Sequence, residues 1–299
     1  MTAMSSIGFI GLGAMGWPMA ARLVAAGHKL IVEDASQERA QAFAADIGAT
    51  AAETPTDVAR GADILITMLP TSAIVAQVMG GDAGACAALR PGTIVIEMSS
   101  GIPAETQRIA EAVRQAGGSL IDAPVSGGVP RARTGELTIM AGGPLEIIDR
   151  VEPVLRCMGT SILRTGDIGS AHAMKALNNL ASAAGLLATV EVLLIGKKFG
   201  LDPALMVDVL NVSTGMNNST QKKLKQFILS RKFSSGFGLD LMVKDLTIAT
   251  GLAEEMELEA PFSALCQKMW KSAAELCGPG HDHTEIARLS EKLAGLELG

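Results

Sequence analysis

The chain has 299 residues, of which 48% are hydrophobic and 19% charged, so it is long enough for two domains of ordinary size and has the composition of a soluble globular protein. Its formal net charge of −6 at pH 7 provides no basic surface, and we therefore expect neither nucleic acid nor a membrane as a partner. It contains no tyrosine, which excludes dehydrogenases whose proton donor is a tyrosine hydroxyl.

Four cysteines without a C-x-x-C pair are typical of reduced thiols, and the start of the chain lacks the charge pattern of an export signal. We therefore expect a cytoplasmic protein. The cysteines are expected to act as small buried hydrophobes, and no metal site is predicted.

The first half of the chain alternates short apolar runs with helical patterns, which is the signature of repeated βαβ units. The early runs are almost continuous in Ile, Val and Leu, as expected for parallel strands that are covered on both faces. This pattern predicts an α/β Rossmann domain, that is, a doubly wound and mostly parallel sheet. The expected strands are residues 7–11, 29–33, 63–69, 93–98, 119–123, 136–141 and 160–165.

The alternation then stops, and a helical pattern runs without interruption from residue 170 to 199, followed only by further helical segments. We predict a dinucleotide-binding Rossmann domain over residues 1–165 and an all-α C-terminal domain over residues 166–299, joined by a long interdomain helix. The most apolar stretch, residues 181–196, carries Glu191 and is shorter than a membrane span, so it is expected to be a buried helix.

A glycine-rich turn follows the first strand and opens a helix. It contains G-x-G-x-x-G as Gly11, Gly13 and Gly16. The first glycine permits a tight turn, the second lets the backbone approach a pyrophosphate and the third lets helix pack on strand. Such a turn can be a plain bend, but its place between strand and helix, with an acid after the next strand, favours dinucleotide binding. The expected cofactor contacts are Gly11, Leu12, Gly13, Ala14, Met15 and Gly16.

Two acids end the second strand, Glu33 and Asp34, and both are expected at the cofactor. Asp34 lies 18 residues beyond Gly16, close to the spacing expected for a carboxylate that binds the adenosine ribose. A carboxylate there repels a 2′-phosphate, and Arg39, one turn further on, is expected to face solvent. We therefore expect NAD rather than NADP. The alternative role of Asp34, capping the following helix, is compatible with ribose binding.

Five motifs together resemble the β-hydroxyacid dehydrogenase family, which includes 3-hydroxyisobutyrate dehydrogenases, tartronate semialdehyde reductases and L-threonate dehydrogenases. The resemblance covers essentially the whole chain, and it implies a Rossmann domain, a helical domain and an active site in the cleft between them. The motifs are GFIGLGAMGWPM (8–19), TMLP (67–70), DAPVSGG (122–128), GSAHAMKALNN (169–179) and FGLDLMVKDLTIA (237–249).

Lys175, Asn178 and Asn179 are spaced at i, i+3 and i+4, so they share one face of the long helix. In isolation this pattern also fits a surface lysine beside solvated asparagines. The resemblance implies that Lys175 is the catalytic proton-transfer group and that Asn179 binds the substrate, with Asn178 beside it. Lys175 then accepts the hydroxyl proton during oxidation and returns it during reduction.

The resemblance also assigns the remaining contacts. Ser126, Gly127 and Gly128 bind the substrate carboxylate, although a plain glycine bend is the alternative. Lys244 reaches the cofactor, and its neighbour Asp245 either orients it or packs locally. At the cofactor we further expect Met68, Leu69 and Pro70 on the adenine side, and Ser99 or Ser100 near the nicotinamide ribose, with Ser100 preferred although the register does not separate them.

The histidines are alternative proton carriers. His172 lies one turn before Lys175, and facing the cleft is one of two orientations open to its side chain. His281 and His283 are expected in a solvated loop before the last helix, because no second ligand cluster completes a metal site with them.

These observations predict an NAD-dependent oxidoreductase that moves hydride between a small 3-hydroxy carboxylic acid and the nicotinamide. The substrate is of the 3-hydroxyisobutyrate, glycerate, tartronate semialdehyde or threonate type, and Asn217, Asn218 and Ser219 would suit a hydroxylated tail. Two alternatives remain open: a non-catalytic NAD(H)-binding regulator, and an imine or semialdehyde reductase on the same scaffold. Small residues along residues 181–188 favour close helix contact, so a homodimer or homotetramer is expected.

Overall fold

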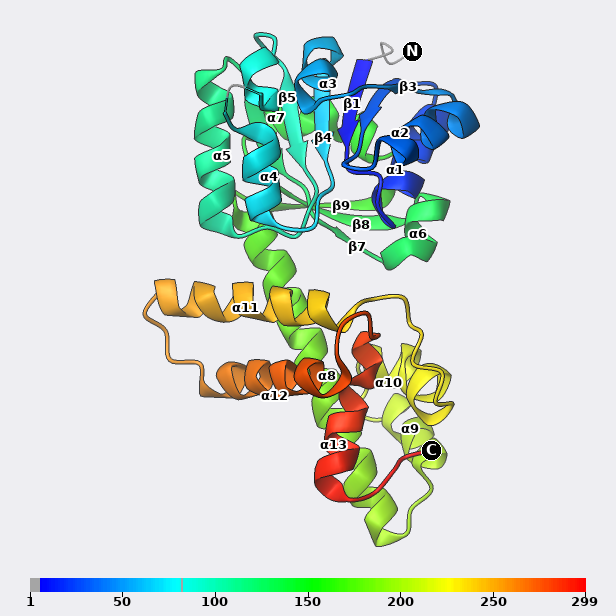
Figure 1. The fold of residues 1–299 in the computed structure, drawn as a ribbon. Coiled ribbons are helices and arrows are strands. Elements are labelled where there is room, and N and C mark those ends of the chain that lie inside the picture. Colours follow the sequence, from blue (N-terminus) through cyan, green and yellow to red (C-terminus); the bar gives the residue numbers. More distant parts are fainter. Residues whose placement is uncertain (1–5, 82) are drawn as a thin grey trace. The chain divides into compact units, whose positions relative to one another are not determined.

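The computed structural model describes residues 6–81 and 83–299 (Figure 1). The chain divides into two compact units, Met1–Lys175 and Ala176–Gly299. The division falls inside the longest helix, α8 (Ser170–Phe199), whereas the sequence pattern places the boundary just before that helix. A domain boundary inside a continuous helix has no local sequence signal, because the helical pattern does not change there.

Unit 1, the first of the two, contains one sheet with the order β3-β2-β1-β4-β5-β6-β8-β7, and β9 pairs with β8. The strands from β3 to β6 are parallel, β8 is antiparallel to β6 and β7, and β9 is parallel to β8. The strands are β1 (Ser6–Ile10), β2 (Lys29–Glu33), β3 (Thr50–Ala51), β4 (Ile64–Thr67), β5 (Ile94–Glu97), β6 (Ser119–Asp122), β7 (Val125–Ser126), β8 (Leu137–Gly142) and β9 (Gly159–Gly166).

All the predicted strands are present, with ends that differ from the prediction by no more than two residues. The prediction missed β3 and β7, which have two residues each and are too short for any apolar period to be visible. Successive strands are added on one side of β1 up to β3, and on its other side from β4 onward, so the strand order reverses between β1 and β4. The crevice at the carboxyl ends of two such strands is where open α/β sheets bind ligands.

Helices cover both faces of this sheet (Figure 1). Alternate strand residues explain the two layers: Leu65 and Val95 pack with α3, α4 and α5, whereas Ile66 and Ile96 pack with α1, α2, α6 and α7. The fold of unit 1 is therefore doubly wound, as predicted. Its helices are α1 (Gly16–Ala25), α2 (Gln37–Phe43), α3 (Pro55–Gly61), α4 (Ser72–Met79), α5 (Pro103–Gln115), α6 (Gly128–Thr134) and α7 (Leu145–Leu155).

Unit 2, the second of the two, is helical throughout the residues that the structure describes as regular elements. Its core is built on α8, whose residues Leu186, Val190 and Leu193 pack around the fully buried Trp270 of α12. The other helices are α9 (Pro203–Asn211), α10 (Asn218–Lys222), α11 (Leu239–Glu255), α12 (Pro261–Cys277) and α13 (Ile286–Ala294).

By length and composition alone α8 would pass as a membrane-crossing helix, and half of its most apolar window is buried inside the protein. The core helix of a soluble protein meets the same test. In α8, the side chains of Leu186, Val190 and Leu193 pack against neighbouring helices of unit 2. The burial agrees with the interpretation of residues 181–196 as a core segment.

Candidate active site

The three glycines of the turn between β1 and α1 have three different environments. Gly11 has φ +99°, and a Cβ there would lie 2.3 Å from the carbonyl oxygen of Met68. A Cβ on Gly16 would lie 1.9 Å from the carbonyl oxygen of Gly11, so only glycine lets α1 start this close to the turn. Around Gly13, in contrast, a Cβ would meet no atom within 4 Å. The middle glycine is the open one, as a turn that receives a pyrophosphate requires.

Asp34 holds this turn in shape. Its buried carboxylate accepts a hydrogen bond from the backbone N–H of Leu12 at 2.7 Å and another from Ser36 at 2.8 Å. Arg39 is exposed, as expected, with 49% of its side chain accessible, and it also forms an ion pair with the same carboxylate at 3.1 Å. The ion pair arises because α2 begins at Gln37, which places Arg39 close to the end of β2.

A cavity of about 740 Å³ adjoins the glycine turn in unit 1. Gly13 and Ala14 form one wall, the indole of Trp17 contributes an apolar surface, and Arg22, Arg39 and Arg133 supply cations. Sequence analysis missed Arg22 and Arg133 because they come from α1 and α6, which are far apart in the chain. A cavity with free backbone N–H groups and guanidinium groups favours a phosphate-bearing ligand.

Glu33, the second acid, lies in the last position of β2, and burial raises its pKa to about 7, with the neighbouring Asp34 charge acting in the same direction. Its backbone carbonyl accepts from the N–H of Gly11 at 2.9 Å. Burial thus favours the neutral form of the Glu33 carboxyl.

The segments after β4 and β5 are joined through Ser99. Its hydroxyl accepts from the N–H of Leu69 at 2.8 Å, and its side chain is buried. Ser100 and Met68 are partly exposed and Pro70 is exposed at the same edge of the sheet. The two serines thus differ in burial: Ser99 is buried and joins two strand ends, whereas Ser100 is partly exposed.

The segment Ser126–Gly128 follows β6 and opens α6. Gly127 has φ +131° and Gly128 has φ +68°, conformations that side chains rarely adopt, and both residues are exposed. A Cβ on Gly127 would lie 2.7 Å from the Cδ of Arg131. The two glycines therefore allow a bend whose backbone N–H groups are open to a ligand, next to the partly exposed hydroxyl of Ser126.

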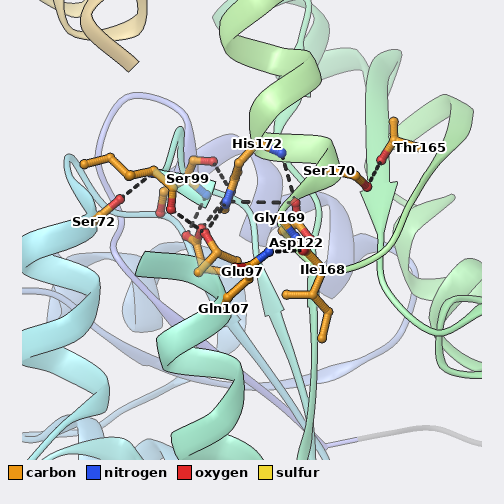
Figure 2. Close-up of polar contacts among 12 residues, drawn as sticks. Ser72, Glu97, Ser99, Gln107, Asp122, Thr165, Ile168, Gly169, Ser170 and His172 are labelled. Carbon is orange, nitrogen blue, oxygen red and sulfur yellow. Dashed lines mark hydrogen bonds and ion pairs between the residues drawn. The ribbon is translucent and has the colours of Figure 1, made fainter. Parts of the chain in front are cut away.

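Lys175 lies in the second turn of α8, and its side chain is 8% exposed. His172, one turn earlier, is completely buried in unit 1, so the option that it faces a cleft is wrong. Figure 2 shows its ring between Glu97 at the end of β5 and Asp122 at the end of β6. Neither carboxylate was among the predicted site residues, because nothing local in the sequence pairs residues so far apart.

In unit 2, Asp245 on α11 connects two of the predicted site residues. Its carboxylate accepts from the Nδ2 of Asn179 at 2.5 Å, and its other oxygen lies 3.5 Å from the Nζ of Lys244. Asn178 donates to the side-chain oxygen of Asn179 at 3.2 Å. Asp245 is 2% exposed, and it orients both neighbours rather than packing alone.

Two expectations about unit 2 need correction. His283 does not lie in a solvated loop: it is 3% exposed in a short helical turn and stacks on Trp270. Asn217 caps α10 in a reciprocal pair with Thr220, and its Nδ2 donates to the hydroxyl of Thr189 at 3.1 Å. Ser219 is buried, so Asn217 and Ser219 serve the fold, whereas Asn218 is exposed. Among the described residues, no group of three His, Cys, Asp or Glu could hold a metal ion.

Two family models cover nearly the whole chain. The model of the NAD-binding domain of 6-phosphogluconate dehydrogenase matches residues 6–166. The model for the NAD-binding region of NADP-dependent 3-hydroxyisobutyrate dehydrogenase matches residues 169–290. The two matches meet close to the start of α8.

Curated relatives match over almost their full length. The chain is 35% identical to 2-(hydroxymethyl)glutarate dehydrogenase of Eubacterium barkeri over 98% of this chain and 97% of that protein. It is 36% identical to 3-hydroxyisobutyrate dehydrogenase of Pseudomonas aeruginosa over 96% of this chain and 98% of the relative. It is 34% identical to 2-hydroxy-3-oxopropionate reductase of Escherichia coli over 98% and 99% of the two chains.

Solved structures agree with these matches. Mycobacterium tuberculosis 3-hydroxyisobutyrate dehydrogenase with L-serine has a TM-score of 0.87 at 29% identity, covering 95% of this chain and 98% of that one. Psf3 in complex with NADP+ and 2-OPP has a TM-score of 0.85 at 30% identity, covering 95% and 99%.

Proposed function

Because the chain belongs to the β-hydroxyacid dehydrogenase family, whose members are NAD(P)-dependent dehydrogenases and reductases, we propose that it oxidises the primary alcohol of a 2-substituted 3-hydroxypropionate with NAD. The names of the three relatives support this substrate class. 3-Hydroxyisobutyrate, 2-(hydroxymethyl)glutarate and the glycerate formed from 2-hydroxy-3-oxopropionate all carry a hydroxymethyl group next to the carboxylate-bearing carbon. They differ only in the third substituent.

The observation that carries the proposal is a buried amine, Lys175, one turn before the buried amide of Asn179 on α8. In the proposed reaction Lys175 takes the proton of the C3 hydroxyl. When bound at the glycine turn, NAD would supply the hydride acceptor, so that oxidation at C3 to an aldehyde would be matched by reduction of the cofactor. Asn179, held by Asp245, orients the hydroxyl, and Asn178 supports it.

We assign the substrate carboxylate to Ser126, Gly127 and Gly128, whose open bend supplies N–H donors and a hydroxyl. Gly11 to Gly16 would hold the pyrophosphate, Ser100 the nicotinamide ribose, and Met68, Leu69 and Pro70 the adenine side. Lys244 is assigned to the cofactor as well. Ser99 contributes indirectly, through its bond to Leu69.

The proposed preference for NAD rests on Asp34, a buried carboxylate at the position that meets the ribose. Arg39 argues in the other direction, but its ion pair to Asp34 reduces the charge it can offer to a 2′-phosphate. We further propose that the enzyme acts in the cytoplasm as a homodimer or homotetramer.

The test is turnover of 3-hydroxyisobutyrate, glycerate, 2-(hydroxymethyl)glutarate and L-serine with NAD and with NADP, with lactate as the control that lacks a C3 hydroxyl. We expect NADH formation with one or more of the first four substrates and none with lactate. Lys175→Ala should lower kcat by about 10²- to 10⁴-fold, the usual contribution of a general acid–base, while leaving NADH binding unchanged.

Lys198→Ala is the matched control, because Lys198 is an exposed lysine on the same helix. It should leave kcat unaltered. Full turnover by Lys175→Ala would remove Lys175 from the reaction, and loss of NADH binding in that variant would mean that its role is not confined to proton transfer.

A further inference from the structure

Three ionisable side chains form a buried cluster in unit 1 that the proposed reaction does not use. The side chains of His172, Glu97 and Asp122 are 0%, 3% and 0% exposed. Burying charges is costly unless they are paired and hydrogen-bonded. A cluster of this kind in the interior therefore needs a reason other than stability.

Both ring nitrogens of His172 have hydrogen-bond partners. Nε2 lies 2.8 Å from the carboxylate of Glu97 and 3.0 Å from the carbonyl oxygen of Ser99, which are both acceptors. Nδ1 lies 2.7 Å from the hydroxyl of Thr106, whose own proton goes to the carbonyl oxygen of Ile102. Burial alone would lower the pKa of His172, but the charges of Glu97 and Asp122 and the bond to Glu97 outweigh it and raise the pKa. The two carboxylates therefore favour the charged form of the ring.

Asp122 holds the start of α8. Its two oxygens accept the backbone N–H groups of Gly169 at 2.8 Å and of His172 at 2.9 Å (Figure 2). These are donors at a helix N-terminus, which have no partner within the helix itself. A carboxylate from β6 therefore serves as the cap of α8, and it fixes where the helix begins.

Glu97 connects the same turn to the strand ends at the candidate cofactor site. Its carboxylate accepts from the N–H of Ser99 at 2.9 Å, in addition to its ion pair with His172. The imidazole also packs on Gly101, where a Cβ would lie 2.9 Å from the ring. The first turn of α8 and the segment 97–101 are consequently joined through one side chain.

We propose that His172 is a positioning residue, which by pairing with Glu97 fixes the rotation of the first turn of α8 and so the place of Lys175 relative to Ser99 and Ser100. The inference rests on the proposed function, because it concerns the lysine that moves the proton. Lys175 follows His172 by three residues, less than one helical turn, so a shift of the imidazole is transmitted directly to it. Misplacement of a reacting group by about 1 Å is enough to cost about 100-fold in rate.

The test is His172→Gln, assayed by steady-state kinetics and by NADH binding. Glutamine keeps hydrogen-bonding capacity but removes the positive charge and leaves the carboxylate of Glu97 buried without its ion partner. We expect kcat to fall by about 10- to 100-fold, while KM for NAD and the Kd for NADH change by less than about threefold. Unchanged kcat, or an equal loss of NADH binding, would overturn the proposal.

The double variant Glu97→Gln/His172→Gln is the decisive rescue. Two neutral amides can hydrogen-bond to each other with no buried charge, so kcat should recover at least tenfold over His172→Gln if the contact positions the helix. Absence of recovery would overturn the proposal. Thr106→Val, a milder change that removes only the partner of Nδ1, should lower kcat by about threefold and keeps the test available if His172→Gln does not fold.

Thr93→Val is the matched control. Thr93 is buried just before the opposite end of β5, and its hydroxyl has no hydrogen-bond partner among the described residues. Its replacement should leave kcat unchanged. Wild-type protein without turnover of any 3-hydroxy acid would sink the proposed function and this inference together. If the wild-type protein is active and the His172→Gln variant has the same kcat, this inference alone would be overturned.

Discussion

Three buried carboxylates at the carboxyl ends of β2, β5 and β6 organise the edge of the sheet in unit 1. Asp34 accepts backbone N–H groups from Leu12 and Ser36, and Glu97 accepts one from Ser99. Asp122 accepts two from the start of α8. Hydrogen bonds from N–H groups to an ionised acceptor are stronger than neutral ones, so a few acids are sufficient to hold the loops that follow the strands.

Asp34 has a second consequence, for the choice of cofactor. Asp34→Asn removes the charge that repels a 2′-phosphate and releases Arg39 from its ion pair. We expect the ratio of kcat/KM for NAD to kcat/KM for NADP to fall at least tenfold, a change of about 1.4 kcal/mol. The measurement is the pair of specificity constants on one substrate.

Asp34→Asn/Arg39→Ala is the companion variant. If the released guanidinium binds the 2′-phosphate, this variant should lose most of the gain in NADP use. The hypothesis fails if wild-type protein prefers NADP tenfold, or if Asp34→Asn leaves the ratio of specificity constants where it was.

At the scale of elements, the features that arise from patterns within a few residues were predictable from the sequence. The features that arise from contacts between distant segments were not. The glycine turn, the strands around it and the helical second half follow from spacing and period over a few residues. Asn217 also carried a local signal, since Thr220 stands three residues later as in a capping box, but it was interpreted as a substrate contact. The buried cluster forms only when three distant segments, which carry His172, Glu97 and Asp122, come together in the fold. No sequence pattern within any one of these segments predicts it.

The short helical turn that holds His283 should make the stability of unit 2 sensitive to acid. Burial lowers the pKa of His283 to about 4 from 6.5, and the charge of Lys223 acts in the same direction. The unfolded chain therefore takes up the proton first as the pH falls. The stabilisation is complete above pH 6.5 and is lost progressively towards pH 4, up to about 3 kcal/mol in all.

Urea unfolding at a series of pH values, followed by the fluorescence of Trp270 in a Trp17→Phe background, measures this loss. His283→Gln should flatten the dependence between pH 6.5 and 4, because glutamine does not titrate there. His281→Gln is the matched control, since that neighbouring histidine is 42% exposed and should leave the dependence in place. An unaltered slope in His283→Gln would contradict the prediction.

At the scale of the whole molecule, the one continuous helix α8 contributes to both units, and its two ends have different structural roles. The amino-terminal turns of α8 are capped by Asp122 in unit 1, whereas its later turns supply the core of unit 2. This division explains why an apolar helix of 30 residues also carries a lysine and two asparagines close to its start.

Unit 2 leaves apolar side chains exposed on α9, where Leu205 and Val209 at i and i+4 are 60% and 54% exposed, and Val212, directly after the helix, is 87% exposed. Exposed apolar residues that line one helix face are typical of a subunit interface, whereas single ones are ordinary. We therefore predict that the protein is a homo-oligomer that associates through α9. Sedimentation velocity of wild-type protein at micromolar concentration should show a dimer or tetramer.

Leu205→Asp should shift that distribution to monomers, because a carboxylate buried in the interface without a cation costs several kcal/mol. Leu145→Asp is the matched control: Leu145 is also 60% exposed, but it lies at the start of α7 in unit 1. Dissociation by the first variant and not by the second would locate the interface on α9. A monomeric wild type, or equal dissociation by both variants, would contradict the prediction, and the exposed leucines and valines would then need another partner.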